Sequence, residues 1–356
     1  MNSTLELSEL NTMIGSLFTV GIASTEPDRN ALALIRDHKV GGIILFARNI
    51  ENPLQVASLC SRLQEEAIAA TGVPLFLAVD QEGGRVARLK EPFTLQPGAS
   101  EIGQSREPLQ QAARFASVTA AEMSLVGLNM DMAPVLDVPS GEPERHLAGR
   151  TFGTNPENVA ALGVKVIQEL QRRKIFAVAK HFPGLGKAGL DPHHLLPIID
   201  SPAAEMEERD LVPFRAAIKA GVCGIMTSHA VYPGLDPGTP ATLSRKIITD
   251  LLRKKLGFRG LVITDDLEMG AVAGGPGVAR SAVAAFQAGG DILLVCENHE
   301  RIVESIDAVK RAVLRGDIPA LRLRESAERI HRAKAAIPKD PDAISLEKVK
   351  AYFHWN

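Results

Sequence analysis

The regular alternation of short apolar runs with longer amphipathic segments constrains this chain more than any other feature. Eight runs are rich in β-branched residues and are bounded by Gly or Pro. They span 16–23, 41–47, 75–80, 128–138, 176–181, 224–229, 261–266 and 292–296. Each is apolar at consecutive positions, which is typical of a parallel strand buried on both faces. The pattern predicts a parallel sheet with other elements packed on both sides.

The segments between these runs have the spacing of helices. Several open with Ser, Asn or Pro and close with Gly, which predicts helices over 53–71, 108–126, 155–174, 203–220, 244–256 and 277–289. Strands and helices in alternation form either an open doubly wound sheet or a closed barrel. Eight repeats, without Gly-x-Gly-x-x-Gly after the first run, favour closure. We expect an α/β protein, a single-domain (β/α)8 TIM barrel over 1–356, with its core at about 12–300 and extra C-terminal helices over 301–356.

Charge and hydropathy narrow the possible partners. The chain has 40 Lys and Arg against 42 Asp and Glu, a formal charge of -2, which gives no basic field for nucleic acid or an acidic membrane surface. Its apolar runs are much shorter than the roughly 20 residues of a membrane helix. The N-terminal segment has no basic stretch or cleavage signal. We expect a cytoplasmic monomer that binds neither nucleic acid nor membranes.

Polar residues follow five successive apolar runs. In a barrel, the carboxyl ends of the strands carry the active site. The polar residues at these ends are Asp80, Gln81, Glu82, Arg85 and Arg88; Asn129, Asp131 and Asp137; Lys180 and His181; Ser228 and His229; Asp265 and Asp266. Each alone is compatible with a salt bridge or a helix cap. Their joint placement at the same strand ends favours a shared polar pocket, since charged groups are rarely buried without partners.

The segment after the fifth run, 180–197, is rich in Gly and Pro and predicts a loop that moves as a lid. Asp191 precedes Pro192 and is biased toward extended backbone, which places the side chains of Asp191 and His193 on one side. A carboxylate on one imidazole nitrogen fixes the tautomer and raises the basicity of the other, as proton transfer near neutral pH requires. The same spacing also fits a solvated turn with a capping histidine.

Five segments then occur in a distinctive order. They are Val-Asp-Gln-Glu-Gly-Gly-Arg-Val at 79–86, Gly-Arg-Thr-Phe-Gly at 149–153, Lys-His-Phe-Pro-Gly at 180–184, Asp-Pro-His-His at 191–194 and Thr-Asp-Asp-Leu-Glu-Met at 264–269. Together they resemble bacterial β-N-acetylglucosaminidases (β-hexosaminidases) of glycoside hydrolase family three. The resemblance extends from about residue 12 to residue 300.

This resemblance implies a retaining exo-glycoside hydrolase that removes terminal non-reducing N-acetyl-β-D-glucosamine. Asp265 matches the nucleophile, His193 the general acid/base on the mobile loop, and Asp191 the residue that orients it. The residues that match sugar-binding positions are Asp80, Arg88, Arg150, Lys180 and His181. The resemblance implies no cofactor and no metal. Strand alternation alone leaves open which of Asp265 and Asp266 faces inward.

The chain also departs from the family pattern in the loop. The family usually has Gly-His-Gly-Asp-Thr where this chain has Gly-Leu-Gly-Lys-Ala at 184–188, and usually Ser at Pro192. The missing histidine and the charge reversal at Lys187 bear on loop closure, substrate range and rate. The Asp191 and His193 pair is retained.

With a cytoplasmic location, the resemblance implies a carbohydrate substrate such as a muropeptide or chitooligosaccharide, released in peptidoglycan recycling. Two other functions remain open. Zinc could bind among His181, His193, His194, His229, Asp265 and Asp266, as in a metal-dependent barrel hydrolase. A catalytically silent sugar-binding homologue would keep the pocket without turnover. Exhaustive chelation would inactivate a zinc-dependent hydrolase. A silent homologue would fail to hydrolyse a chromogenic N-acetyl-β-glucosaminide. Phosphorolysis in place of hydrolysis also remains open.

Overall fold

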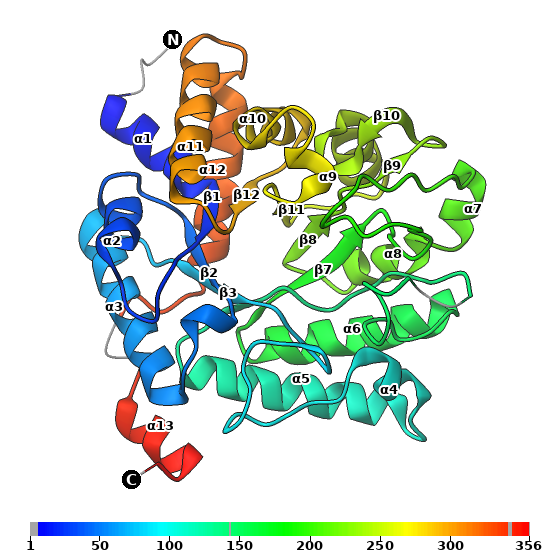
Figure 1. Cartoon of the computed structure of the whole chain (residues 1–356), viewed down its shortest axis with the longest axis horizontal. Helices are drawn as coiled ribbons and strands as arrows, with labels where there is room; N and C mark the ends of the chain where they lie inside the picture. The colour runs from blue at the N-terminus through cyan, green and yellow to red at the C-terminus, as the bar shows by residue number, and fades with distance from the viewer. Residues whose placement is uncertain (1–5, 142–143, 341–343, 356) are drawn as a thin grey trace.

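The computed structural model describes residues 6–141, 144–340 and 344–355, so the outermost residues of the expected domain and tail lie outside it. The described residues form a closed barrel of eight parallel strands (Figure 1). These are β1 (Phe18–Gly21), β2 (Gly42–Leu45), β3 (Phe76–Val79), β6 (Met130–Asp131), β7 (Phe176–Phe182), β8 (Gly224–Thr227), β11 (Leu261–Asp266) and β12 (Ile292–Val295). Each coincides with one of the eight apolar runs, and β7 extends one residue beyond its run, to Phe182. The predicted (β/α)8 barrel is confirmed.

Each barrel strand pairs with the next barrel strand along the chain. Strand β1 closes the barrel by pairing in parallel with β12, with Phe18 opposite Leu293. All residues of β1, β2, β3, β8 and β12 are buried. Their inward side chains fill the barrel, and their outward side chains pack against helices, which explains the uninterrupted apolar runs.

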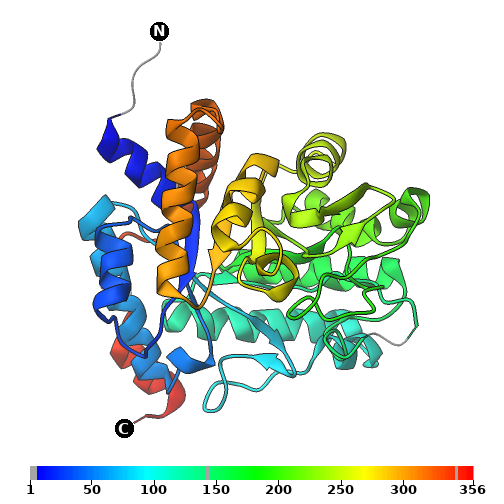
Figure 2. The same cartoon turned by 45° about the horizontal axis from the view of Figure 1, so that its top comes forward.

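Helices surround the barrel (Figures 1 and 2). They are α2 (Arg29–Arg36), α3 (Pro53–Thr71), α5 (Pro108–Leu125), α6 (Pro156–Arg172), α7 (Ala203–Glu208), α8 (Leu211–Lys219), the π-helix η3 (Lys246–Lys255), α10 (Val278–Ala288) and α11 (His299–Leu314). Local sequence fixes several ends. The side chains of Asn52, Asn155 and Asn298 each accept a hydrogen bond from the backbone N–H three residues later. Helix α3 ends at Gly72, whose φ of 70° favours glycine.

The single helix predicted over 203–220 is wrong. The structure has two helices, α7 and α8, with the break at Arg209 and Asp210. Pro213 lies in the first turn of α8, where its missing N–H costs nothing. In one continuous helix its ring would clash with the carbonyl of Arg209, four residues earlier. Helix α2 and the N-terminal helix α1 (Leu7–Ser16) were not predicted.

Short elements follow several strands at the carboxyl end of the barrel. They are η1 (Ala47–Asn49), the hairpin β4 (Gln81–Gly83) and β5 (Val86–Ala87), α4 (Ala99–Gln104), the hairpin β9 (Val231–Tyr232) and β10 (Asp236–Pro240), η2 (Ala241–Leu243) and α9 (Gly270–Ala273). Strand β6 is shorter than its apolar run, 128–138. Beyond Asp131 that run continues as irregular chain with one isolated bridge, Val135 to Lys180.

The chain ends in α12 (Ala320–Lys334) and α13 (Leu346–Phe353). Helix α13 packs on α3, and α12 packs on α1 (Figure 1). The fully buried Asp291, which precedes β12, forms ion pairs with Arg253 and with Arg329 of α12. These contacts fasten α12 to the amino end of the barrel. Among the described residues, no helix combines the length and apolar character needed to cross a membrane.

Candidate active site

A cavity of about 640 Å³ opens at the carboxyl ends of the barrel strands. The eight residues that the resemblance matches to catalytic or sugar-binding positions all line it, namely Asp80, Arg88, Arg150, Lys180, His181, Asp191, His193 and Asp265. They come from β3, the β4–β5 hairpin, the segment before α6, β7 and its loop, and β11. Barrel closure therefore brings together side chains up to 185 positions apart in the sequence (80 to 265).

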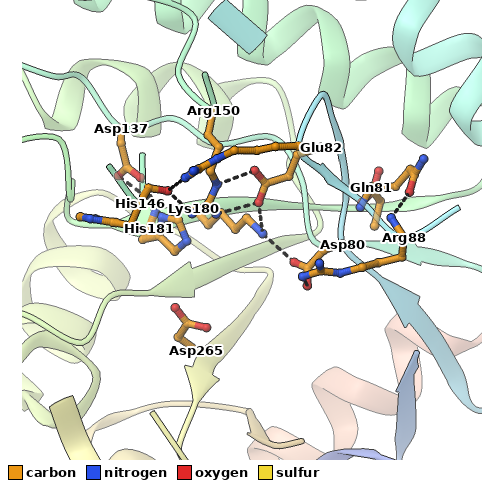
Figure 3. A network of polar contacts seen from close by, with 12 residues as sticks. Asp80, Gln81, Glu82, Arg88, Asp137, His146, Arg150, Lys180, His181 and Asp265 are labelled. Carbon is orange, nitrogen blue, oxygen red and sulfur yellow. Dashed lines mark hydrogen bonds and ion pairs between the residues drawn. The ribbon is translucent and has the colours of Figure 1, made fainter. Parts of the chain in front are cut away.

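One side of the cavity is a network of ion pairs (Figure 3). Lys180 Nζ lies 2.8 Å from Asp80 Oδ1 and 2.7 Å from Glu82 Oε1. Arg150 donates from Nε and Nη2 to the two oxygens of Glu82, each at 2.8 Å. Arg88 Nη2 approaches Asp80 Oδ2 at 3.3 Å. The fork of Arg150 on Glu82 fixes the guanidinium in one orientation, as bidentate pairs do.

These groups stay charged although they are largely withdrawn from water. Burial alone would raise the pKa of Asp80 and of Glu82, but the Lys180 ammonium and the neighbouring guanidinium groups lower both, that of Glu82 to about 2. Burial alone would lower the pKa of Lys180, and the carboxylates of Asp80 and Glu82 raise it instead. The cavity wall thus presents fixed charges that can donate to and accept from hydroxyl groups.

Glu82 is predicted from the sequence only as one of the polar residues at the strand ends, and the structure makes it part of the site. Its signal was the spacing to Asp80, because side chains two apart along an extended chain face the same side. Gln81 between them faces the other way, and its Oε1 accepts hydrogen bonds from the backbone N–H groups of Arg88 (2.9 Å) and Leu89 (3.0 Å). Gln81 therefore holds the hairpin that carries Arg88.

His181 is oriented by Asp137, a fully buried carboxylate. His181 Nδ1 lies 2.7 Å from Asp137 Oδ2. The backbone N–H groups of His181 and Leu185 donate to Asp137 Oδ1 at 3.2 and 2.7 Å. Burial would raise the pKa of Asp137, but the His181 ring and these N–H donors lower it. With Nδ1 donating to Asp137, Nε2 of His181 is left for a ligand in the cavity.

His146 also lines the cavity and was missed, since nothing in its surroundings marks it in sequence. It is 7% exposed, and neither ring nitrogen has a hydrogen-bond partner within the described part of the chain. Burial lowers the pKa of His146, so its ring is neutral near pH 7. Its carbonyl oxygen accepts a hydrogen bond from Arg150 Nη1 at 3.0 Å and another from Arg85. A buried imidazole without partners in a polar cavity is available to a ligand.

Asp191 and His193 form a pair on the loop after β7. His193 Nδ1 lies 2.6 Å from Asp191 Oδ1, which also accepts from the His193 backbone N–H at 3.0 Å. Burial would raise the pKa of Asp191, and the hydrogen bonds from His193 lower it. The pair is open to solvent, with side chains 37% exposed at Asp191 and 58% at His193. The loop rests on α9, where Gly270 N–H donates to the His193 carbonyl at 3.0 Å.

Two of the loop residues that depart from the family pattern anchor the base of this loop. Leu185 is 3% exposed and donates its backbone N–H to Asp137. Lys187 Nζ lies 3.1 Å from Ser201 Oγ and forms an ion pair with Glu205 of α7. These contacts connect the residues before Asp191 to the barrel and to α7, whereas Asp191 and His193 themselves remain exposed.

The structure distinguishes Asp265 from Asp266 at the end of β11. Asp265 lines the cavity and faces the ion network across it (Figure 3). Oδ1 of Asp265 accepts a hydrogen bond from the backbone N–H of Asp266 at 2.9 Å. Within the described part of the chain, no side chain hydrogen-bonds to Asp265. Asp266 lies outside the lining, beside Cys296, where burial raises its pKa to about 7.

Not every polar residue at a strand end reaches the cavity, so for these residues the prediction of a shared pocket is wrong. The Asn129 side chain donates a hydrogen bond to the Leu75 carbonyl and accepts one from the Leu77 N–H. The Asp131 carboxylate accepts a hydrogen bond from the backbone N–H of Gln81. Ser228 bonds the hydroxyl of Tyr232 at 2.8 Å, and His229 Nε2 lies 2.8 Å from the carbonyl oxygen of Asp266. These side chains hold strands and loops in place.

Four of the residues weighed above as zinc ligands, His181, His193, His194 and Asp265, line the cavity, but they are not grouped closely enough to hold a metal ion. Within residues 6–141, 144–340 and 344–355, no three His, Cys, Asp or Glu side chains gather as a metal-binding group. The three cysteines, Cys60, Cys223 and Cys296, are all free thiols. The functional groups that line the cavity are carboxylates, imidazoles and fixed cations.

Comparison with known proteins agrees with this arrangement. Residues 9–333 match the glycosyl hydrolase family 3 N terminal domain. A β-hexosaminidase of Nitrosomonas eutropha is 38% identical over 295 residues, 82% of each chain. A β-N-acetylhexosaminidase structure from Beutenbergia cavernae has a TM-score of 0.86 at 32% identity, over 94% of this chain and 100% of that chain. A family 3 β-N-acetylglucosaminidase from Paenibacillus sp. str. FPU-7 has a TM-score of 0.90 at 37% identity. This chain is covered to 94% in that comparison and spans 63% of the Paenibacillus chain. The chain therefore belongs to glycosyl hydrolase family 3, and it is a glycosidase of the β-hexosaminidase class.

Proposed function

We propose that this protein is a retaining exo-hydrolase that removes terminal non-reducing N-acetyl-β-D-glucosamine, with Asp265 as nucleophile and His193 as general acid/base. One observation carries the proposal. A single cavity contains a carboxylate on β11 that pairs with no side chain in the described part of the chain, a carboxylate–imidazole pair on the loop after β7, and a wall of fixed charges. Retaining glycosidases use a nucleophile and a separate acid/base in this way, although the usual acid/base is a second carboxyl group.

In the first step, Asp265 attacks the anomeric carbon as the bond from that carbon to the leaving oxygen breaks. His193, protonated on both nitrogens and held through Nδ1 by Asp191, gives its Nε2 proton to the leaving oxygen. In the second step, neutral His193 takes a proton from water as the water oxygen attacks the anomeric carbon, and Asp265 leaves. The two displacements retain configuration, and both side chains regain their starting states.

The ion network is proposed to bind the terminal sugar. The Asp80 side chain is 16% exposed, and its carboxylate is held in place by Arg88 and Lys180. Lys180, Arg88 and Arg150 donate to hydroxyl oxygens, and Nε2 of His181 adds a further polar contact. Because these groups already pair with one another, they need no rearrangement to receive a sugar.

Of the two carbohydrate classes that the sequence suggests, muropeptides and chitooligosaccharides, we propose muropeptides as the substrate, within peptidoglycan recycling in the cytoplasm. N-acetylmuramyl groups carry a carboxylate, and Arg85 and Arg145 add positive charge to the cavity lining. A higher kcat/KM for a muramyl disaccharide than for chitobiose supports this choice. Equal values contradict it. Cell fractionation tests the location.

We further propose that the enzyme acts as a monomer, because one chain supplies every group in the reaction scheme. Light scattering during size-exclusion chromatography measures the mass directly. A dimer would contradict the monomer without affecting the assignment of residues.

The decisive experiment is trapping with a 2-fluoro derivative of the sugar that carries a good leaving group. The fluorine slows both steps, so the covalent intermediate accumulates when its formation remains the faster of the two. Peptide mass spectrometry should locate the sugar on Asp265. A label on Asp266 or on another residue would contradict the assignment. A chromogenic N-acetyl-β-D-glucosaminide that is hydrolysed equally by wild type and Asp265→Asn would reject the mechanism.

A further inference from the structure

A second cavity lies at the amino end of the barrel, the end remote from the candidate active site. Its volume is about 380 Å³. Part of its wall comes from α1 and from the residues just before β2 and β3, and the rest comes from α12. Met13, Val40, Val73 and Ile330 make much of this wall apolar.

Lys334, in the last turn of α12, is the unusual member of this wall. It is only 5% exposed. Its Nζ lies 5.1 Å from the centroid of the Phe76 ring, and within the described part of the chain no carboxylate or carbonyl oxygen pairs with it. Burial lowers the pKa of the Lys334 amine to about 7. A lysine that served only to pack its stem would extend its ammonium into water.

The other charged groups of the cavity leave an excess of positive charge. Lys39 donates to the carbonyl oxygen of Ala70 at 3.2 Å, and His331 and Arg332 follow one another on α12. Glu328 is the single acidic residue among those lining the cavity. An apolar wall with an unpaired amine favours a ligand with an apolar body and one negative charge, since the anion would supply the counter-charge that the lysine lacks.

We propose that this cavity is a binding site for an amphipathic carboxylate, whose apolar chain lies against Met13, Val40 and Val73 and whose carboxylate pairs with Lys334. Binding favours the charged form of the amine. At pH 8 the free protein holds Lys334 mostly neutral, so binding takes up a proton. Proton uptake distinguishes this site from a simple apolar void, which would bind a chain without a change in protonation.

Isothermal titration calorimetry of the full chain with decanoate tests the proposal, with decanol as the uncharged analogue. Titrations at pH 8 in phosphate and in Tris give the number of protons taken up, because the two buffers differ in heat of ionisation. We expect a single site, net proton uptake, and binding of decanoate at least about tenfold tighter than that of decanol, as a charge-assisted hydrogen bond provides.

Lys334→Met keeps the length and apolar body of the side chain and removes the amine. It should weaken decanoate binding about tenfold or more, abolish proton uptake and leave decanol binding and glycoside hydrolysis unchanged. Lys254→Met, at an exposed lysine of η3, is the matched control and should behave as wild type. Absence of decanoate binding, equal binding of decanoate and decanol, or unchanged binding in Lys334→Met would each overturn the proposal. Hydrolysis is measured separately, so none of these results bears on the assignment of Asp265.

Discussion

The two sides of the candidate active site are built on opposite principles. At the centre of the ion network, the side chains of Glu82 on β4 and Lys180 on β7 are only 3% exposed. The Asp191–His193 pair lies on a loop with its imidazole 58% exposed. Rigid elements position binding groups well, while loops allow a group to move during a reaction. In the proposed scheme, the groups that bind the sugar are therefore fixed in the barrel, and the group that transfers the proton lies on the loop.

The largest effect is expected for Asp265→Asn, which removes the proposed nucleophile. Turnover of a chromogenic N-acetyl-β-D-glucosaminide should fall by about 10⁴-fold or more, because no covalent intermediate can form. Asp266→Asn is the matched control one residue away. Its side chain lies outside the cavity, so it should keep most of the activity. A comparable loss in both variants would contradict the assignment of Asp265 as the nucleophile.

On the loop, His193→Ala should reduce kcat by about 10²–10⁴-fold, the usual contribution of general acid/base catalysis. Binding of a competitive inhibitor and the melting temperature should change little, because the ring is exposed and binds no sugar hydroxyl in the proposed scheme. His194→Ala, which alters the adjacent exposed imidazole, should cost far less. Equal losses in kcat and in inhibitor affinity would place His193 with the binding groups instead.

In the network, Glu82→Gln should act on stability and binding together. It leaves Arg150 and Lys180 buried with less counter-charge, and breaking a buried pair costs about 3–5 kcal/mol. Chemical denaturation should show this loss, accompanied by a raised KM. Glu205→Gln removes the partner of Lys187 at the base of the loop, where the Glu205 side chain is 44% exposed, and should cost no more than about 1 kcal/mol. Similar losses in the two variants would remove the contrast between network and loop.

A smaller effect that depends on pH is expected at Asp210, beneath Gly184 of the loop. It is 2% exposed, neither oxygen has a hydrogen-bond partner in the described part of the chain, and burial raises its pKa to about 7. Between about pH 4 and pH 7, the folded state holds a proton that the unfolded state has lost, so this group lowers stability as pH rises through that window.

Asp210→Asn removes this penalty. The variant should match wild type near pH 4 and exceed it by about 1–3 kcal/mol at pH 8, because no charge is then buried. Melting curves of both proteins from pH 4 to pH 8 measure the difference. A constant difference across the range would mean that Asp210 is charged in the folded protein throughout.

Much of the fold was predictable from local sequence. The eight apolar runs each coincide with a barrel strand, and α3 begins at Pro53 and is followed by Gly72, as the sequence predicts. Pro213 also indicates the break before α8, but helical periodicity alone predicts one continuous helix there. Helix α2 was overlooked because it is only eight residues long and depends on a single cap at Asp28.

The sequence by itself determined the barrel, the residue types at its strand ends and the order of the family motifs, because apolar patterning, capping and backbone restriction act between residues near in the chain. Only the tertiary structure decided that Asp265 rather than Asp266 faces the cavity and that Glu82 joins Lys180 and Arg150. It also placed the His146 ring in the cavity wall without a hydrogen-bond partner among the described residues. Burial and charge pairing arise between segments far apart in sequence, and barrel closure sets which side chains share a low-dielectric space.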